Sequence, residues 1–275
     1  MTLRFAYNTN GAANHRLADA VALIADAGYD GVALTLDHHH LDPMEDGWER
    51  RAEALARDLS ARKLGSVIET GARYLLDPRA KHEPTLLTPS AEGRDRRVTF
   101  LNRAVDIAAI LGAEAVSFWA GVPRPGVDRG QALEWLRDGV SRVLDHAAAR
   151  GVTAAFEPEP GMLVETVDDW SALSLPGLTL ALDLGHLLVT GEREPPKAVH
   201  EFAPHLGTVA IEDMARGTHI HLPFGEGDMD IPACLDALEA VDFRRLVCVE
   251  LSRESHRADS MIPQSLAWLR TCRAR

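Results

Sequence analysis

The chain has 275 residues, of which 46% are hydrophobic and 25% are charged, so its composition is that of a globular protein with a sizeable core. Its formal net charge of −12 disfavours a nucleic-acid partner, because phosphate backbones attract basic surfaces. No apolar run approaches the roughly 18 residues that span a bilayer, and we therefore expect no membrane partner.

Short apolar runs alternate along the chain with longer amphipathic patterns. Each run is nearly continuously apolar, which is typical of parallel strands that are covered on both faces. Eight such runs are predicted as strands, and they are residues 3–8, 31–36, 66–70, 115–120, 153–158, 178–184, 207–213 and 245–251.

Helical patterns fill the intervals between these runs. They are clearest in residues 15–30, 96–114 and 130–151, where apolar residues recur at helical spacing and a glycine stands at or near the end. A glycine in that position is a common helix C-cap. Since parallel strands need long crossovers, eight strand–helix repeats predict a single-domain (β/α)8 TIM barrel over residues 1–275. A doubly wound open sheet is the alternative, but no GxGxxG motif follows the first predicted strand.

Two longer segments interrupt this alternation. Residues 71–95 follow the third predicted strand, and residues 214–230 follow the seventh. Both segments therefore leave the C-terminal end of a strand, where barrel enzymes build their active sites. Long ordered loops in compact domains are commonly functional, so we expect both segments to contribute to a site.

Acidic residues stand at the C-terminal ends of many predicted strands. A barrel gathers these ends on one rim. Carboxylates that share a cleft repel one another and are costly to desolvate, and a divalent cation offsets both effects. A single strand-end Asp more commonly caps a helix or forms a turn, so the metal hypothesis depends on the joint occurrence. The residues concerned are Glu69, Glu157, Asp183, Glu212, Asp213 and Glu250, with Asp37, His38, His39 and His40 after the second strand.

We therefore interpret Asp183 as a metal ligand, with His186 three residues later beside it. Oxygen-rich ligation with one or two imidazoles suits Mn²⁺, Mg²⁺, Co²⁺ or Zn²⁺ and does not select among them. No thiolate competes for the ion, because Cys248 precedes the strand end at Glu250. Glu159, in the sequence EPEPG, has a plainer interpretation as a turn residue.

Four motifs in chain order resemble the xylose isomerase-like TIM barrels. This superfamily groups sugar and sugar-phosphate isomerases and epimerases with the endonuclease IV-type enzymes. The resemblance spans nearly the whole chain and is more specific for the superfamily than for a substrate. The motifs are FEPEPG at 156–161, DLGH at 183–186, HIHLPFGEGDMD at 219–230 and CVEL at 248–251.

The resemblance implies Glu157, Asp183 and Glu250 as ligands of a divalent metal. The epimerases have a fourth ligand, a histidine on strand seven, and here Ala210 occupies that position. Endonuclease-type members also carry Asp-x-His in the following loop. The matching positions here are His219 and His221, so we expect one of these two histidines to replace the missing ligand, with Glu212 as the second choice and water as the remaining one.

The resemblance also implies an activity, namely proton transfer at the carbon next to the carbonyl of a sugar, ketose or cyclitol-like polyol. Glu157 and Glu250 would act as both ligands and acid–base pair. The remaining candidates would contact the substrate: His186 and Arg253 through its hydroxyl or carboxylate groups, Arg73 and His82 as a cover from segment 71–95, and Trp119 as an apolar wall or, equally well, a core aromatic.

Three other functions are weighed against this one. A metal-dependent lyase or dehydratase on a keto-polyol would use the same ligands and the same deprotonation, and the sequence does not separate it from an epimerase. An endonuclease IV-like phosphodiesterase is disfavoured by Ala210 and by the net charge. A barrel that binds a small molecule without turnover is disfavoured by the convergent acids.

Cysteine usage and the N-terminus indicate a cytoplasmic location. The three cysteines are odd in number and lack CxxC spacing, which is typical of a reducing compartment without disulfides. Residues 1–10 do not have the basic and apolar regions of a secretory signal. Related barrels are often dimers or tetramers, so the resemblance is compatible with a homo-oligomer.

Overall fold

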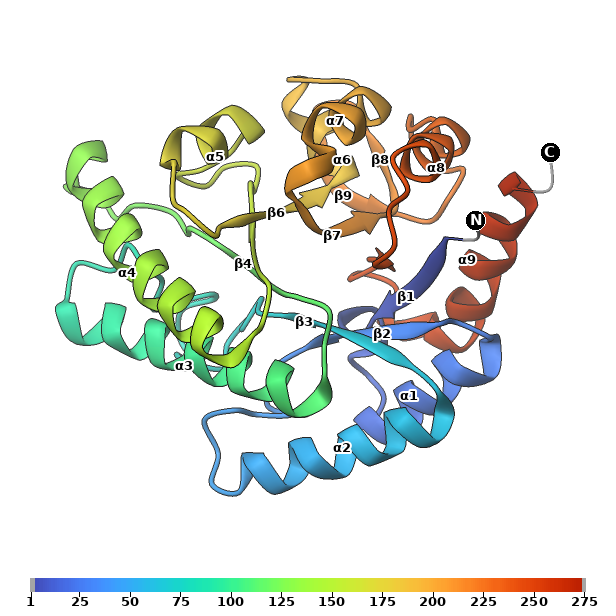
Figure 1. Cartoon of the computed structure of the whole chain (residues 1–275), viewed down its shortest axis with the longest axis horizontal. Helices are drawn as coiled ribbons and strands as arrows, with labels where there is room; N and C mark the ends of the chain where they lie inside the picture. Colours follow the sequence, from blue (N-terminus) through green and yellow to red (C-terminus); the bar gives the residue numbers. More distant parts are fainter. Residues whose placement is uncertain (1–2, 274–275) are drawn as a thin grey trace.

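A computed structural model describes residues 3–273, and its centre is a closed barrel of eight parallel strands (Figure 1). All eight predicted strands are present, so the predicted TIM barrel is confirmed. Around the barrel each strand pairs with its neighbour in sequence, and β10 closes the ring against β1. The strands are β1 (Arg4–Asn8), β2 (Gly31–Thr35), β3 (Gly65–Glu69), β4 (Val116–Trp119), β5 (Ala154–Glu157), β6 (Thr179–Asp183), β7 (Leu206–Ile211) and β10 (Leu246–Val249).

Helices surround the strands on the outside (Figure 1). The three predicted helical segments are confirmed, and each is capped by its glycine in the left-handed conformation, with φ of 91° at Gly28, 63° at Gly112 and 66° at Gly151. The helices are α1 (Leu17–Ala27), α2 (Trp48–Arg62), α3 (Ala91–Leu111), α4 (Arg129–Arg150), α5 (Val167–Leu173), α6 (Leu184–Thr190), α7 (Pro195–Phe202), α8 (Ile231–Ala240) and α9 (Ala258–Arg273).

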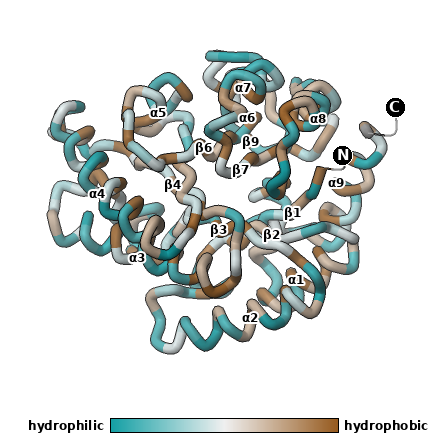
Figure 2. Tube along the Cα trace, viewed as in Figure 1, coloured by the Kyte–Doolittle hydropathy of each residue, from teal (hydrophilic) through white to brown (hydrophobic). Residues whose placement is uncertain are grey.

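The main hydrophobic core lies between the barrel and these helices. Helix α2 shows how the sequence builds it: Ala52, Leu55 and Leu59 recur at helical spacing and are buried. Figure 2 shows hydrophilic residues along much of the outward side of α2 and α4. None of the helices within residues 3–273 combines the length and the hydropathy needed to cross a membrane.

A second, smaller core fills the inside of the barrel. It consists of Ala6, Ala33, Val67, Ala115, Leu246 and Cys248. Side chains alternate along a strand, so the residue two positions after an inward-facing one also faces inward. Val67, Ala181 and Cys248 face inward. Glu69, Asp183 and Glu250, which stand two positions after them, therefore face inward as well. The barrel interior is therefore apolar in one layer and acidic in the next, at the C-terminal ends of the strands.

The two long segments have different structures. Residues 71–90 form a loop with no regular element, and α3 begins directly after it. The segment after β7 instead begins with an antiparallel hairpin of β8 (Asp213–Ala215) and β9 (Thr218–Leu222), which lies beside β7 in Figure 1. The hairpin turns at Gly217, whose φ of 70° a glycine adopts without strain. The predicted seventh strand thus ends at Ile211, and Asp213 belongs to β8.

Candidate active site

A cavity of about 510 Å³ opens at the C-terminal ends of the barrel strands. Its lining comes from β2 to β5, from β9 and α6, and from the segments that follow β1, β3, β5 and β10. Asp183 lies in an adjoining space of about 20 Å³ inside the barrel, which Glu69, Glu157 and Glu250 also line. The other nine of the ten predicted site residues line the cavity itself, and they are Arg73, His82, Trp119, Glu157, His186, His219, His221, Glu250 and Arg253.

Buried carboxylates dominate the floor of this cavity. Burial raises the pKa of Glu157 well above its usual range, and the charges of Glu159, Asp183 and Glu250 raise it further. Burial and Glu250 raise the pKa of Glu69 to about 7. These side chains therefore repel one another when ionised, which is the environment that a bound cation would relieve.

Asp183 fulfils the structural role of a helix cap and also keeps an oxygen free. Its Oδ1 accepts hydrogen bonds from the backbone N–H groups of Gly185 (2.8 Å) and His186 (3.1 Å), at the start of α6. Its Oδ2 is buried and has no hydrogen-bond partner among the described residues, and it lies 3.5 Å from His186 Nε2. Although burial alone would raise the pKa of Asp183, His186 and His221 lower it.

Three imidazoles form a cluster beside Asp183. His186 Nε2 lies 3.1 Å from His219 Nε2, and the rings of His219 and His221 are 5.6 Å apart. His186 Nδ1 lies 3.2 Å from the carbonyl oxygen of Pro158, to which it can donate, and this leaves Nε2 as the nitrogen with a lone pair. Burial lowers the pKa of His186 to about 4, so this imidazole is neutral at neutral pH and able to bind a cation.

Glu212 completes a group of buried polar atoms without partners. Both of its carboxylate oxygens and Nδ1 of His221 lack a hydrogen-bond donor among the described residues, and Glu212 is 0% exposed. Burial and close contact with the Asp183 carboxylate raise the pKa of Glu212 well above its usual range. His221 Nδ1 lies 3.9 Å from Glu212 Oε2. Asp183, Glu212 and His221 each offer a ligand atom, and these three atoms lie within 4.8 Å of one another. Carboxylate oxygens and an imidazole nitrogen at this separation fit a divalent metal ion.

Two further triads adjoin this one and share residues with it. His186, His219 and His221 form one, and Glu157, Glu159 and His186 form the other, again with ligand atoms within 4.8 Å of one another. Ala210, in the position where the epimerases carry a histidine, pairs in register with Asp183 and offers no ligand atom. The side chains that approach Asp183 are instead those of Glu212, His186 and His221.

Glu159 is a site residue whose importance the sequence interpretation underestimated. It does form a turn, because its backbone N–H donates to the carbonyl oxygen of Val164. Its carboxylate nevertheless lines the cavity and lies 3.7 Å from both His186 Nδ1 and His219 Nε2. Burial and the charge of Asp183 raise its pKa to about 8. One indication of this role was present in the sequence, because Glu159 stands two residues after Glu157 with a proline between them.

The histidines after β2 do not join this site. His38 Nδ1 lies 2.8 Å from Asp37 Oδ1, His38 is exposed, and His40 is buried with its Nε2 3.0 Å from the carbonyl oxygen of His15. Asp37, His38 and His39 form a separate group with ligand atoms within 4.8 Å of one another. None of residues 37–40 lines the cavity.

Three side chains pack together and support the loop of residues 71–90. Trp119 contacts both Arg97, whose guanidinium is 4.5 Å from the indole ring, and His82, whose ring meets it edge to face with 5.1 Å between the centroids. Arg97 Nη2 donates to the carbonyl oxygen of Thr70, and His82 Nδ1 lies 2.8 Å from that of Gly71. Trp119 is 4% exposed, so it is a core aromatic and a wall of the cavity at once.

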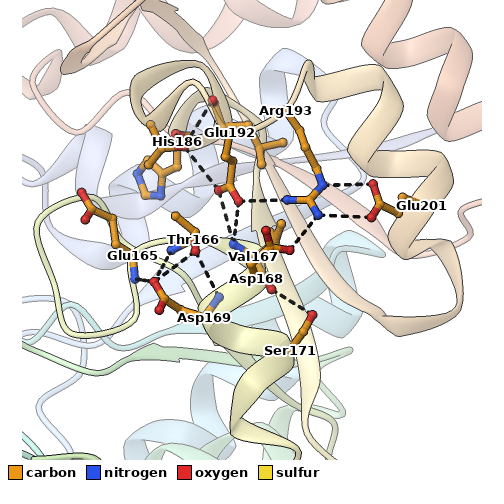
Figure 3. Close-up of polar contacts among 12 residues, drawn as sticks. Glu165, Thr166, Val167, Asp168, Asp169, Ser171, His186, Glu192, Arg193 and Glu201 are labelled. Carbon is orange, nitrogen blue, oxygen red and sulfur yellow. Dashed lines mark hydrogen bonds and ion pairs between the residues drawn. The ribbon is translucent and has the colours of Figure 1, made fainter. Parts of the chain in front are cut away.

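A polar network connects the C-terminal end of helix α6, which carries His186, to helices α5 and α7 (Figure 3). Thr190 Oγ1 lies 3.1 Å from the carbonyl oxygen of His186 and 3.3 Å from the carboxylate of Glu192. Glu192 also accepts from the backbone N–H of Val167 on α5, and it pairs with Arg193. Arg193 in turn reaches Glu201 on α7. The ring of His186 is thus oriented by a helix that is fastened to both of its neighbours.

The comparisons with known proteins agree with this fold. Residues 21–272 match a family model described as the xylose isomerase-like TIM barrel. The chain belongs to this family. No curated protein sequence matches the chain.

Solved structures of several proteins are similar to this barrel at low sequence identity. A 3-keto-D-glucoside 4-epimerase from E. coli has a TM-score of 0.76 at 18% identity, covering 98% of this chain and 100% of that one. The IOLI protein, solved with a zinc atom, has a TM-score of 0.74 at 16% identity, covering 98% and 97%. An AP endonuclease of family 2 from Brucella melitensis has a TM-score of 0.75 at 20% identity, covering 98% and 99%. At such identities the likeness shows the fold alone.

Proposed function

We propose that the protein is a divalent-metal-dependent isomerase or epimerase, which moves a proton next to the carbonyl of a sugar, ketose or cyclitol-like polyol. The observation that carries this proposal is the group of orphaned atoms on Asp183, Glu212 and His221, beside further carboxylates in one cavity. The 3-keto-D-glucoside 4-epimerase and the zinc-containing IOLI protein, which share the fold, support it by analogy.

Asp183, Glu212 and His221 would hold the metal ion, because the atoms concerned are buried and face one another with no other hydrogen-bond partner among the described residues. This set differs from the one that the resemblance implies, in which Glu157 and Glu250 are ligands as well. In the proposed set Glu212 and His221 together replace the histidine ligand that is missing at Ala210. The bound ion would polarise the substrate carbonyl and stabilise the negative charge that develops on its oxygen.

Glu157 and Glu250 would transfer the proton. They lie on β5 and directly after β10, and two strands, β6 and β7, separate them around the barrel. The two carboxylates would therefore reach a bound substrate from different sides, as removal and return of a proton on opposite faces require. Asn10 Nδ2 donates to Glu250 Oε1 at 2.8 Å and orients that carboxylate. Trp119 would cover an apolar face of the sugar ring.

The test is hydrogen exchange into a panel of ketoses and keto-cyclitols with Mn²⁺ in D₂O, followed by NMR. We expect solvent deuterium at the carbon beside the carbonyl, and loss of this signal after removal of the metal or in Glu157→Gln. Glu165→Gln is the matched control, because Glu165 lies in the same loop and does not line the cavity. A metal-bound protein that incorporates no deuterium into any member of the panel would contradict the proposal. Loss of water from the substrate would instead indicate the lyase alternative.

A further inference from the structure

Three cationic side chains stand around the mouth of the cavity. Arg73 and Lys81 come from the loop after β3, and Arg253 comes from the loop after β10. Arg73 is half-buried, whereas Lys81 and Arg253 are exposed. The cavity therefore has two electrostatic layers, with carboxylates and imidazoles at its floor and cations at its rim.

These cations are not used in hydrogen bonds or salt bridges by the described part of the chain. Within residues 3–273 none of the three side chains makes a hydrogen bond or a salt bridge, although Glu69, Glu159 and Glu250 line the same cavity. Some arginines elsewhere pair with acids, as Arg193 does with Glu201, and others, such as Arg79, have no ion pair among the described residues. The three cations are set apart because they line one cavity together. Three such cations that line one cavity could together bind an anionic group.

The loop that carries Arg73 and Lys81 is fixed at its base. The backbone N–H of His82 donates to the carbonyl oxygen of Arg73 at 2.5 Å, and the His82 ring packs against Trp119. Ala72 and His82, which flank the two cations in sequence, have φ of 49° and 68°. Non-glycine residues with positive φ are strained and persist where the surroundings impose them, commonly at ligand sites. The backbones of Arg73 and Lys81 are thus held at the cavity mouth.

Charge also fixes the direction in which an anionic substrate would enter. The net charge of −12 and the acidic floor repel anions, so a negative group is favoured only near the three cations. We propose that the cavity takes substrates with a terminal anionic group, a phosphate monoester or a carboxylate, which Arg73, Lys81 and Arg253 hold at the mouth while the neutral hydroxy-carbonyl end reaches the floor. This inference rests on the proposed function, from which the hydroxy-carbonyl end of the substrate is taken.

The experiment compares binding of three ketoses to the Mn²⁺-loaded protein by calorimetry. D-fructose carries no charge, D-fructose 6-phosphate carries a terminal phosphate, and 5-keto-D-gluconate carries a terminal carboxylate. We expect at least one anionic ketose to bind about tenfold or more tightly than fructose, as charge-assisted hydrogen bonds allow. This preference should fall when salt rises from about 50 mM to about 500 mM, because added ions screen the rim charges. Preference for one anion over the other identifies the group.

Glutamine variants test whether the three cations cause the preference for anionic ketoses. Arg73→Gln, Lys81→Gln and Arg253→Gln should each reduce the ratio of anionic to neutral affinity by about fivefold to tenfold. Arg79→Gln is the matched control, because Arg79 is an exposed arginine of the same loop that does not line the cavity, and the ratio should not change. Equal affinity for all three ketoses, or a preference that survives in all three cavity variants, would overturn the inference.

Deuterium exchange into the same ketoses separates this inference from the proposed function. Exchange into fructose without any preference for the anionic ketoses would leave the function intact and refute the anionic substrate. A preference that depends on the three cations, without exchange into any ketose, would support the anion site and refute the proton-transfer function.

Discussion

Gly185 lies directly against the carboxylate of Glu212, since a Cβ at Gly185 would come within 2.3 Å of Glu212 Oε1. The same Cβ would lie 2.8 Å from Cγ and Sδ of Met214. An alanine at position 185 must therefore displace Glu212, one of the three proposed ligands. We expect Gly185→Ala to weaken metal binding by at least about tenfold and to lower the free energy of unfolding by about 1–3 kcal/mol through overpacking. Metal titration and chemical denaturation measure the two effects.

Gly139→Ala is the control for overpacking in that experiment. A Cβ at Gly139 in α4 would lie 2.8 Å from Cδ2 of Leu86, so it also crowds a buried neighbour, but neither residue lines the cavity. We expect unchanged metal affinity and a smaller loss of stability, because alanine favours the interior of a helix more than glycine does. If Gly185→Ala binds metal as tightly as Gly139→Ala does, Glu212 is not a ligand.

The two histidines of β9 should differ in their effect on metal binding. His221 has a buried Nδ1 without a hydrogen-bond partner among the described residues, and it shares a candidate triad with Asp183 and Glu212. His219 is more exposed and contacts His186 and Glu159 instead. We expect His221→Ala to weaken metal binding by about 100-fold or more and His219→Ala by about tenfold or less. Similar, small losses in both variants would remove His221 from the ligand set.

The stability of the metal-free protein should fall as the pH rises from about 7.5 to about 9. Burial and neighbouring carboxylates raise the pKa of Glu69 to about 7 and that of Glu159 to about 8, whereas unfolded glutamates are already ionised in this range. The folded state therefore binds more protons than the unfolded state and loses stability as these protons leave. His186, with a pKa of about 4, is neutral in the folded protein across this window, and unfolded histidines, with a pKa of about 6.5, have released most of their protons by its lower end.

Thermal melts of EDTA-treated protein across this range measure the effect, which we expect to be a decrease of several degrees in Tm. Bound metal should remove most of this decrease, because the cation stabilises the ionised carboxylates. Glu159→Gln should shrink it, since an amide does not titrate. A Tm that is constant or increases between the two pH values in the absence of metal would contradict the electrostatic description of the site.

The sequence predicted the barrel well because its signals are local. Continuous apolar runs mark strands that are buried on both faces, and a glycine such as Gly112 marks a helix end wherever left-handed backbone is needed. Asp183 and Glu250 could be predicted for a related reason, since each stands at a strand end that the barrel brings to one rim.

Other parts of the site depend on contacts between distant segments and gave a weaker signal. Glu159 looks like a turn residue and is one, and only the position of His186 across the barrel makes it part of the cavity. Glu212 was the second choice as a ligand, because its burial against Gly185 depends on how α6 packs on the end of β7. The second strand of the β8–β9 hairpin has the sequence THIHL and is partly exposed, so it lacks the apolar run by which the barrel strands were predicted.

Arg97 should act on the cavity through the loop of residues 71–90 rather than through stability. Its guanidinium is fully buried, stacks on Trp119 and donates to the carbonyl oxygen of Thr70, while Nε and Nη1 have no hydrogen-bond partner within residues 3–273. Burial lowers its pKa to about 10, against the opposing charges of Glu69 and Glu83, so it remains charged at neutral pH. Replacing such a partly satisfied buried charge by an apolar residue of similar length costs little overall stability.

We therefore expect Arg97→Met to leave the free energy of unfolding within about 2 kcal/mol of the parent protein and to speed amide exchange in residues 71–82 by about tenfold. Loss of the contacts to Thr70 and Trp119 frees the base of that loop. Arg103→Met is the control, because Arg103 lies on the same helix and donates to Pro43 instead. Exchange that is unchanged in residues 71–82, or that increases equally in both variants, would show that Arg97 does not position the loop.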